Sequence, residues 1–434
     1  MAEQMMQHKD GEKVAKQSIP AGYKQTEVGV IPQEWSLISL NSIVDSAAPI
    51  CYGVVQVGKY DEAGIPIIAI KFLKNISTAP LHRTSIEIEK PYVRSRLKKD
   101  DVLISIKGTI GHIGVVPEGF EGNISREIAR IRLRDGIFSK YVAHQLEAPA
   151  TQERISKSVV GTTRLEFSIS AVREFLIPIP SDCQEQKQIA DVLSDCDALI
   201  SGLEYLISKK KAIKTATMQQ LLTGRTRLPL FALHPDGTTK GYKSSELGQI
   251  PQDWEVAPIG SVLSITTGAK NTQDKVDDGR YPFFVRSQTV ERINTYSFDG
   301  EAVLTAGDGV GTGKVFHYIN GKFDFHQRVY LMHNFGERVS GYFFYLFFSN
   351  HFFDRIMSMT AKSSVDSVRR EMITDMKMVL PSKAEQTAIA TILSDMDSEL
   401  AALEQKLAKA RDVKQGMMQQ LLTGRIRLPL PQEA

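Results

Sequence analysis

The sequence predicts a mixed α+β protein: two small, pseudo-repeated α/β domains separated by two long helices that pair as an antiparallel coiled coil. Three observations lead to this fold class. The 434 residues exceed the usual limit of one hydrophobic core, which is about 250 to 300 residues. Phrases at both ends of the first half recur in the second half. Each half also closes with a long proline-free segment whose apolar residues have helical spacing.

The internal repeat is clearest in three phrases, which differ little between their copies. They are MQQLLTGRTRLPL at 218–230 and MQQLLTGRIRLPL at 418–430, GYKQTEVGVIPQEW from Gly22 and GYKSSELGQIPQDW from Gly241, and EQKQIADVLSDCD from Glu185 and EQTAIATILSDMD from Glu385. The stretches between these phrases match only faintly. Similar ends predict a shared structural or partner-binding role, and diverged interiors predict two related domains that bind different ligands.

These phrases divide the chain into seven predicted segments. They are a flexible polar leader (1–21), a first α/β domain (22–183), a central spacer helix (184–224), a linker (225–240), a second α/β domain (241–383), a C-terminal spacer helix (384–424) and a tail (425–434). The leader lacks the apolar core of a signal peptide, so we expect a cytoplasmic protein.

Both spacer helices carry an apolar stripe, because apolar residues recur three and four positions apart. The residues predicted to form the helix seam are Ile189, Cys196, Leu203, Ile389, Met396 and Leu403, and the predicted stripe also takes in Leu199, Leu206 and Ile213. Gly224 and Gly424 suit the C-cap position. About 39 residues correspond to roughly 58 Å of helix. A lone helix would leave its stripe in water, so pairing is expected, with two separate core helices as the alternative.

The interiors contain short β-type runs, among them IPIIAI (65–70), DVLISI (101–106) and IARIRL (128–133). Local charge is more informative than the net charge of +3. The run from Lys90 to Lys107 holds six basic and two acidic residues, and basic residues of the second half alternate with aromatic and amide side chains. This mixture suits phosphate and base-edge contacts with DNA, although charge runs also occur on plain solvated surfaces.

Several other classes of protein are disfavoured. The aromatic run GYFFYLFFSNHFF from Gly341 is too short and too polar to span a bilayer. Three cysteines without a CxxC pair argue against a disulfide framework or a zinc knuckle. AGDGVGTGK at 306–314 has Asp308 where a P-loop needs glycine, so a turn between strands is predicted there. Neither HExxH nor GxSxG occurs, and we expect no catalysis by this chain and no bound metal.

The layout resembles the DNA-specificity subunit of type I restriction-modification enzymes. The motifs that carry this resemblance are Ile31 to Trp35 and Ile250 to Trp254, Glu185-Gln186 and Glu385-Gln386, and Leu221 to Leu228 and Leu421 to Leu428. It covers nearly the whole chain except the leader. The resemblance implies two target recognition domains, each of which reads one half of a bipartite, asymmetric site in double-stranded DNA, and helices that hold them apart.

The resemblance also implies which partners and cofactors are involved. The partners would be two modification subunits, which methylate adenine with S-adenosylmethionine, and restriction/translocase subunits, which use ATP and Mg²⁺ to translocate and cleave DNA. None of these cofactors is expected in this chain. A coiled-coil adaptor with two protein-binding domains is the alternative function from a different class.

Site residues are predicted from their chemistry, because the interiors of the family vary most. The DNA-binding candidates are Lys107, Thr109, His112, Arg126 and Arg164 in the first domain, and Lys314, His317, His326, Gln327, Arg328 and Lys362 in the second. Each could instead be a surface charge or a turn residue. Gln186 and Gln386 are candidates for partner docking, with a hydrogen bond at the helix N-terminus as the alternative.

Overall fold

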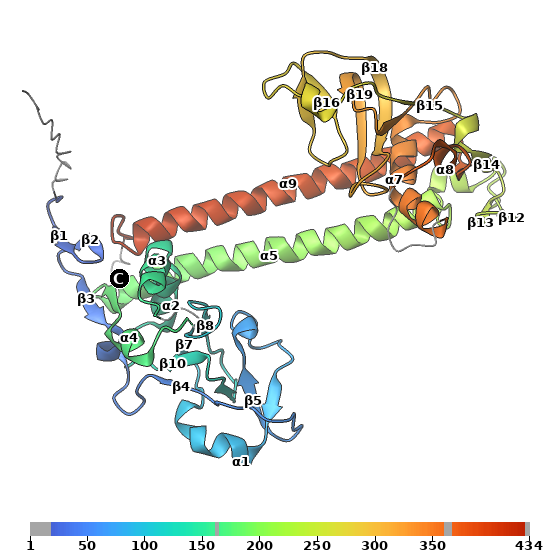
Figure 1. Ribbon diagram of the computed structural model, residues 1–434. Helices are drawn as coiled ribbons and strands as arrows, with labels where there is room; N and C mark the ends of the chain where they lie inside the picture. The colour runs from blue at the N-terminus through green and yellow to red at the C-terminus, as the bar shows by residue number, and fades with distance from the viewer. Residues whose placement is uncertain (1–18, 161–164, 360–366, 430–434) are drawn as a thin grey trace, which may run out of the picture. The chain divides into compact units, whose positions relative to one another are not determined.

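The chain folds into two compact units, and the computed structural model describes residues 19–160, 165–359 and 367–429 (Figure 1). The first unit comprises the described residues up to Glu204 and from Lys406 onward. The second unit comprises Tyr205 to Gln405. Each unit therefore combines one α/β domain with a segment of each long helix. One of these helices belongs to the first half of the sequence and the other to the second half.

The first unit contains a four-stranded sheet in the order β4-β10-β7-β8 and a three-stranded sheet in the order β6-β5-β9. Its strands are β1 (Tyr23–Thr26), β2 (Gly29–Pro32), β3 (Ser36–Ser39), β4 (Cys51–Tyr52), β5 (Ile65–Ile68), β6 (His82–Thr84), β7 (Val102–Ser105), β8 (Ile113–Val115), β9 (Asn123–Ile124), β10 (Ile128–Ile131) and β11 (Leu176–Ile179). Its shorter helices are α1 (Ile86–Glu89), α2 (Ser139–Glu147), α3 (Pro149–Lys157) and α4 (Ile169–Glu174).

The second unit contains a six-stranded sheet in the order β15-β20-β18-β19-β16-β17, beside the strand pairs β12-β13 and β14-β21. Its strands are β12 (Tyr242–Ser245), β13 (Gly248–Pro251), β14 (Glu255–Pro258), β15 (Ser264–Thr267), β16 (Tyr281–Phe284), β17 (Glu291–Ile293), β18 (Phe298–Ala306), β19 (Phe316–Phe325), β20 (Val329–His333) and β21 (Lys377–Leu380). Its shorter helices are α6 (Pro229–Ala232), α7 (Gly341–Ser358) and α8 (Arg370–Thr374).

The strand pairing of the first unit's two sheets corresponds to the strand pairing within the six-stranded sheet of the second unit. β7 pairs with β10 and β8 in the first unit, as β18 pairs with β20 and β19 in the second. The parallel pairing of β5 with β9 corresponds to that of β16 with β19. The predicted strand runs hold β5, β7 and β10, and the glycine-rich stretch after Ala306 connects two strands as predicted. The aromatic run forms α7, and within the described ranges no helix is long and apolar enough to cross a membrane.

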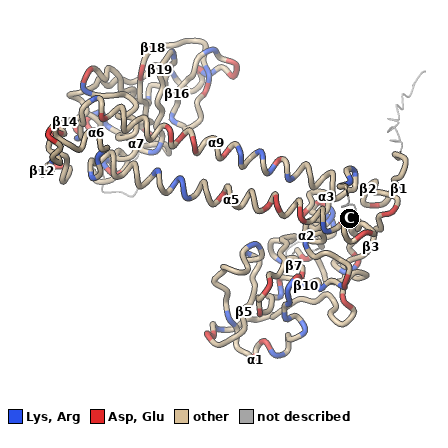
Figure 2. Tube along the Cα trace, turned by 180° about the vertical axis from the view of Figure 1, so that it is seen from behind, with Lys and Arg blue, Asp and Glu red and all other residues tan. Residues whose placement is uncertain are grey.

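The two long helices are α5 (Cys183–Leu222) and α9 (Lys383–Leu421), close to the predicted spans (Figure 1, green and red). They run antiparallel within each unit, because residues later in α5 meet residues earlier in α9. In the second unit Lys210 pairs with Glu399 at 2.7 Å, and Lys211 pairs with Glu404 at 2.7 Å. Figure 2 shows charges of both signs along these helices. Ion pairs thus help to align the two helices of the coiled coil.

The seam of the helix pair differs from the prediction in its central part. Ile189, Leu203 and Ile389 are buried, and Cys196, Met396 and Leu403 are half-buried. Leu199, Leu206 and Ile213, however, are 51%, 37% and 42% exposed, so their assignment to the stripe was wrong. The buried series continues through Leu203 and Ile207, and further along α5 the half-buried Lys210 and Lys214 reach carboxylates of α9. Paired charges replace apolar contacts there.

The repeated phrase that ends each long helix has a defined structural role. In the second unit, Trp254 Nε1 donates to Glu385 Oε2 at 3.0 Å, and Arg227 Nη2 donates to the same oxygen at 2.6 Å. Arg227 also donates to Asp253 at 2.7 Å. Glu385 is 1% exposed. The phrase at 218–230 therefore stabilises the domain that follows it in the sequence, rather than the one that precedes it.

The first unit contains the same arrangement, made with the C-terminal copy of the phrase. Trp35 Nε1 donates to Glu185 Oε2 at 3.3 Å, and Arg427 Nη2 donates to that oxygen at 2.8 Å. Arg427 also pairs with Glu34, and this hydrogen bond holds the pKa of Glu34 below its usual value. We call each Trp–Glu–Arg set a frame cluster. Each frame cluster joins three segments. They are the start of a spacer helix, the repeated phrase at 218–230 or 418–430 (the tail phrase), and the segment Ile31 to Trp35 or Ile250 to Trp254 (the IPxxW phrase).

Glycine is required at the end of each long helix for two reasons. Gly224 and Gly424 have φ values of 71° and 68°, in the left-handed region that favours glycine. A Cβ atom on Gly224 would lie 2.5 Å from Pro251 Cδ, and one on Gly424 would lie 2.4 Å from Pro32 Cγ. The helix cap thus packs directly against the IPxxW phrase, which explains why both phrases recur together.

Candidate nucleic-acid interface

In the first unit, three of the predicted DNA-binding residues lie on the connection between β7 and β8. Lys107 is half-buried and pairs with Glu166 at 3.3 Å, whereas Thr109 and His112 are exposed. Ser105 Oγ fixes the turn, because it donates to the Thr109 carbonyl at 2.6 Å and accepts from the His112 amide at 2.8 Å. Two side chains of this loop are therefore free to contact a ligand.

The segment between β9 and β10 lies beside this loop. Ile106 N donates to the Glu127 carbonyl at 2.7 Å, which places the segment against the start of the loop. Arg126 is exposed, and Glu127 is half-buried and accepts from Ser125 Oγ at 3.1 Å. The sequence prediction missed Glu127, because it considered only basic and neutral side chains as DNA ligands.

In the second unit, the corresponding loop between β18 and β19 carries a different set of charges. Asp308 lies between two arginines: Arg286 donates to its Oδ1 at 2.9 Å, and Arg328 lies 3.5 Å from its Oδ2. The two arginine side chains are 44% and 64% exposed. Asp308 thus orients two guanidinium groups that remain accessible. Arg286 was not predicted as a site residue, although it follows directly on a β-type run.

Amide and aromatic groups complete this surface of the second unit. Gln327 is exposed and donates to the Asn271 side chain. Lys314 is exposed, with its ammonium nitrogen 5.6 Å from the centre of the Phe353 ring. Arginine, glutamine and asparagine are the side chains that pair best with guanine and adenine in the major groove. The second unit therefore presents side chains of these types on adjoining loops.

The β7–β8 connection and the β18–β19 connection, which are the two candidate recognition loops, carry opposite charges at equivalent register positions. Lys107 forms an antiparallel bridge with Glu166, and Asp308 forms the same bridge with Ser367. Glu127 and Arg328 are likewise equivalent, because each lies two residues after the partner of a parallel bridge, Ser125 or His326. Lysine and glutamate in one unit thus correspond to aspartate and arginine in the other.

Two predicted DNA-binding residues are buried, so direct base contact is not supported for them. His317 is 8% exposed, and its Nε2 lies 3.1 Å from the Ser287 carbonyl. His326 is 5% exposed, and its Nδ1 accepts from the Arg328 amide at 2.9 Å. Burial lowers the pKa of both imidazoles below the ordinary value. They pack and orient the loop residues. Arg164 and Lys362 lie outside the described residues.

The two docking candidates are also internal. Gln186 is 2% exposed, donates to the Pro180 carbonyl and accepts from the Phe138 amide at 3.1 Å. Gln386 is fully buried, donates to the Pro381 carbonyl at 2.9 Å and accepts from the Ser340 amide at 2.9 Å. These contacts match the hydrogen-bonding alternative. A docking role for either glutamine stays a prediction that its placement does not favour.

One group of side chains has the composition of a metal site in the part of the chain that the structure describes. His144, Glu147 and Asp197 place their ligand atoms within 4.8 Å of one another. Lys414 already pairs with Asp197, and Lys74 pairs with Glu147. These ammonium groups neutralise both carboxylates, so the group fits a network of ion pairs better than a cation site.

Comparison with known proteins gives a consistent result. The family model described as "Type I restriction modification DNA specificity domain" matches residues 32–213 and 251–410. The chain is 31% identical over 206 residues to the type I restriction enzyme EcoBI specificity subunit of Escherichia coli, covering 47% of this chain and 43% of that protein. It is 24% identical to the putative type I restriction enzyme MjaX specificity subunit of Methanocaldococcus jannaschii, covering 94% and 97% of the two chains.

The similarity to the E. coli relatives is partial, since the match to the EcoDI specificity subunit spans 35% of that protein's length. Among solved structures, the type I restriction-modification S subunit from M. genitalium superposes with a TM-score of 0.61 at 14% identity. That superposition covers 89% of this chain and 96% of the other. At this identity the likeness shows a shared fold, with two domains and long helices.

Proposed function

Because the chain belongs to the type I restriction-modification DNA specificity family, we propose that each unit reads one half of a bipartite, asymmetric sequence in double-stranded DNA. The observation that carries this proposal is the charge reversal between the recognition loops. The frame clusters of the two units make the same hydrogen bonds, yet Lys107 and Glu127 correspond to Asp308 and Arg328. Two identical recognition domains related by a twofold axis would read a palindromic site. Two domains with different recognition loops are expected to read two different half-sites.

The side chains also suggest which base edges each unit contacts. Arg286 and Arg328 can donate to the two acceptors of guanine, and Gln327 can pair with adenine. In the first unit, Glu127 can accept from the amino group of cytosine, while Arg126 can donate to guanine or to a phosphate. The half-site read by the second unit is thus expected to contain guanine.

The long helices would set the spacing between the half-sites and hold two modification subunits. Equivalent subunits need equivalent exposed surfaces, and the repeat provides such a pair. Ile213 in the second unit and Val413 in the first are 200 residues apart and are 42% and 48% exposed. We place docking at these residues instead of the buried glutamines, since exposed apolar side chains on a helix suit a partner surface.

The chain itself would catalyse nothing. It would direct modification subunits that methylate adenine with S-adenosylmethionine and, together with restriction/translocase subunits, ATP- and Mg²⁺-dependent cleavage of DNA in the cytoplasm. Three carboxylates that would suit catalysis already have structural partners. Glu185 and Glu385 belong to the frame clusters, and Asp308 orients two arginines.

The test is a selection of bound duplexes from a random DNA pool by the chain assembled with its modification subunits. Arg328→Ala should relax the half-site of the second unit by about 10- to 100-fold at one base pair, since a bidentate contact contributes about 1–3 kcal/mol. The matched variant Glu127→Ala should relax only the other half-site. Equal loss of both half-sites in either variant, or no change in both variants, would contradict the proposal.

A further inference from the structure

Arg130 is a buried cation that has no counter-ion among the residues that the structure describes. It lies on β10 opposite Leu103 of β7 and is 1% exposed. Its Nη2 donates to the Pro49 carbonyl at 3.0 Å and lies 3.5 Å from Cys51 Sγ. Among the described residues, Nε and Nη1 have no hydrogen-bond partner and no carboxylate pairs with the guanidinium. A buried charge is costly unless an anion neutralises it, so this position calls for one.

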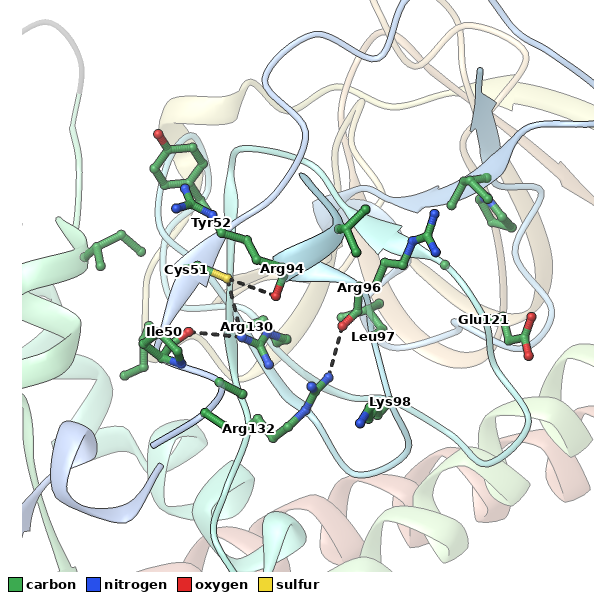
Figure 3. A pocket seen from close by; sticks show the side chains of 18 of the residues that line it. Ile50, Cys51, Tyr52, Arg94, Arg96, Leu97, Lys98, Glu121, Arg130 and Arg132 are labelled. Atoms are coloured by element: carbon green, nitrogen blue, oxygen red, sulfur yellow. Dashed lines mark hydrogen bonds between the residues drawn. The ribbon is translucent and has the colours of Figure 1, made fainter. Parts of the chain in front are cut away.

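Arg130 is one of the residues that line a cleft of about 1150 Å³ in the first unit (Figure 3). The basic residues that line the cleft are Arg83, Arg94, Arg96, Lys98, Arg130, Arg132 and Arg173, and the acidic one is Glu121. Figure 3 shows Arg94, Arg130 and Arg132 around this space. Arg94, Arg96 and Lys98 belong to the basic run from Lys90 to Lys107.

Only some of these cations are neutralised within the chain. Arg132 forms a two-pronged pair with Asp101 at 2.7 and 2.8 Å, and Arg96 forms one with Glu89 at 2.7 and 2.8 Å. In the described part of the chain, the remaining basic residues of the lining have no ion pair, and the Arg83 Nε atom is buried without a partner. The cleft therefore carries a clear excess of positive charge.

The second unit indicates that the fold does not require this cation. The register places Arg130 opposite Leu103 and Leu331 opposite Leu304, and Leu103 and Leu304 are equivalent in the repeat. Leu331 is fully buried in an apolar cluster with Leu304 and Val329. An apolar residue thus satisfies the same position of the sheet, and arginine there needs a reason other than packing.

The cleft is also separate from the recognition loop of its unit. Lys107 follows β7 and Arg126 precedes β10, whereas Lys98 precedes β7 and Arg132 follows β10. Because the two strands are antiparallel, these pairs mark opposite ends of the sheet. We propose that this cleft is a second ligand site, which binds the phosphoryl groups of a free phosphate compound or of the DNA backbone. Clustered arginines are well suited to such groups.

Titration of the full-length chain with pyrophosphate, at constant ionic strength, tests the proposal. Arg130→Leu should weaken pyrophosphate binding by about tenfold or more, because hydrogen bonds to charged groups are the strong ones. The variant should melt at the same or a higher temperature, since leucine occupies this position in the second unit. Arg94→Ala at the exposed rim should also weaken binding. The matched control Arg134→Ala changes an exposed arginine outside the cleft and should leave it unchanged.

A second arm identifies the source of the phosphoryl groups. If duplex DNA of random sequence displaces pyrophosphate and binds more weakly to Arg130→Leu, the backbone is the ligand. If duplex binding is unaltered, the ligand is a free phosphate compound. Pyrophosphate binding that is absent, or equal in the wild-type chain and both cleft variants, would overturn the proposal. The site does not depend on the proposed half-site reading, which the duplex selection tests separately.

Discussion

The frame clusters of the two units contain the same residue types and hydrogen bonds, whereas the candidate recognition loops carry opposite charges. Trp35, Glu185 and Arg427 repeat the contacts of Trp254, Glu385 and Arg227. In the candidate recognition loops, Lys107 of the first unit corresponds to Asp308 of the second unit. Structural contacts within the chain leave little freedom to change, because each buried partner requires the other. The loops that we propose to contact DNA carry no such constraint, so their charges can differ between the two units.

The largest effect is expected when a frame cluster is broken. Arg227→Ala should lower the free energy of unfolding by about 3–5 kcal/mol, because it leaves the buried Glu385 without its partner. Arg427→Ala should cost less, since the Arg427 side chain is 39% exposed against 4% for Arg227. Chemical unfolding of the two variants measures both values. A larger loss in Arg427→Ala would show that the two clusters are not equivalent supports.

A smaller loss is expected at the glycine caps. Gly224→Ala and Gly424→Ala should each destabilise the chain by about 1–2 kcal/mol from the positive φ alone, and by more if Pro251 or Pro32 cannot move. The matched control is Gly416→Ala inside α9, where a Cβ would meet nothing within 4 Å and should stabilise the helix. Thermal melting distinguishes these cases. Unchanged melting of the cap variants would argue against the close packing of cap and IPxxW phrase.

The proposed docking residues give a test of equivalence between the units. Ile213→Asp and Val413→Asp should each weaken the binding of one modification subunit by roughly tenfold, because burial of such a side chain contributes about 1.5–3 kcal/mol. Ser208→Asp, on an exposed position of α5, is the control. Native mass spectrometry of the assembly would count the subunits. Retention of two subunits in both variants at limiting concentration would refute this docking assignment.

The smallest effect concerns pH and the second unit alone. Burial lowers the pKa values of His317, His326 and His333. The unfolded chain then binds more protons than the folded chain below about pH 6.5, so the free energy of unfolding should decrease as pH falls through that value. Urea unfolding at pH 7.5 and 5.5 measures the difference. His317→Gln should reduce it, and an identical pH dependence in this variant would exclude His317 as a contributor.

Periodicity and repetition predicted the long helices, the strands and the glycine caps, because these depend on local spacing in the sequence. The seam was predicted less well. Leu199, Leu206 and Ile213 have helical spacing, but the pairing register turns them outward and puts Lys210 and Lys214 against carboxylates. Spacing alone does not reveal which stripe faces the partner helix.

The exposure of the candidate site residues could not be predicted for a related reason. Arg328 and Gln327 were proposed from their chemistry and are exposed, whereas His317 and His326 were proposed on the same grounds and are buried. Arg286 was missed because it comes to Asp308 through sheet pairing of segments distant in sequence. Burial and long-range pairing are properties of the folded chain, and no single residue type encodes them.

The C-terminal copy of the repeated phrase contacts the first domain, so residues far apart in the sequence meet there. Arg427 meets Glu34 and Glu185, and the Tyr23 hydroxyl donates to the Gly424 carbonyl at 2.9 Å. A circularly permuted gene that starts in the linker at 231–240 and joins residue 429 to residue 22 through a short peptide would preserve every one of these contacts. The contacts of both frame clusters are therefore expected not to depend on which half of the sequence is translated first.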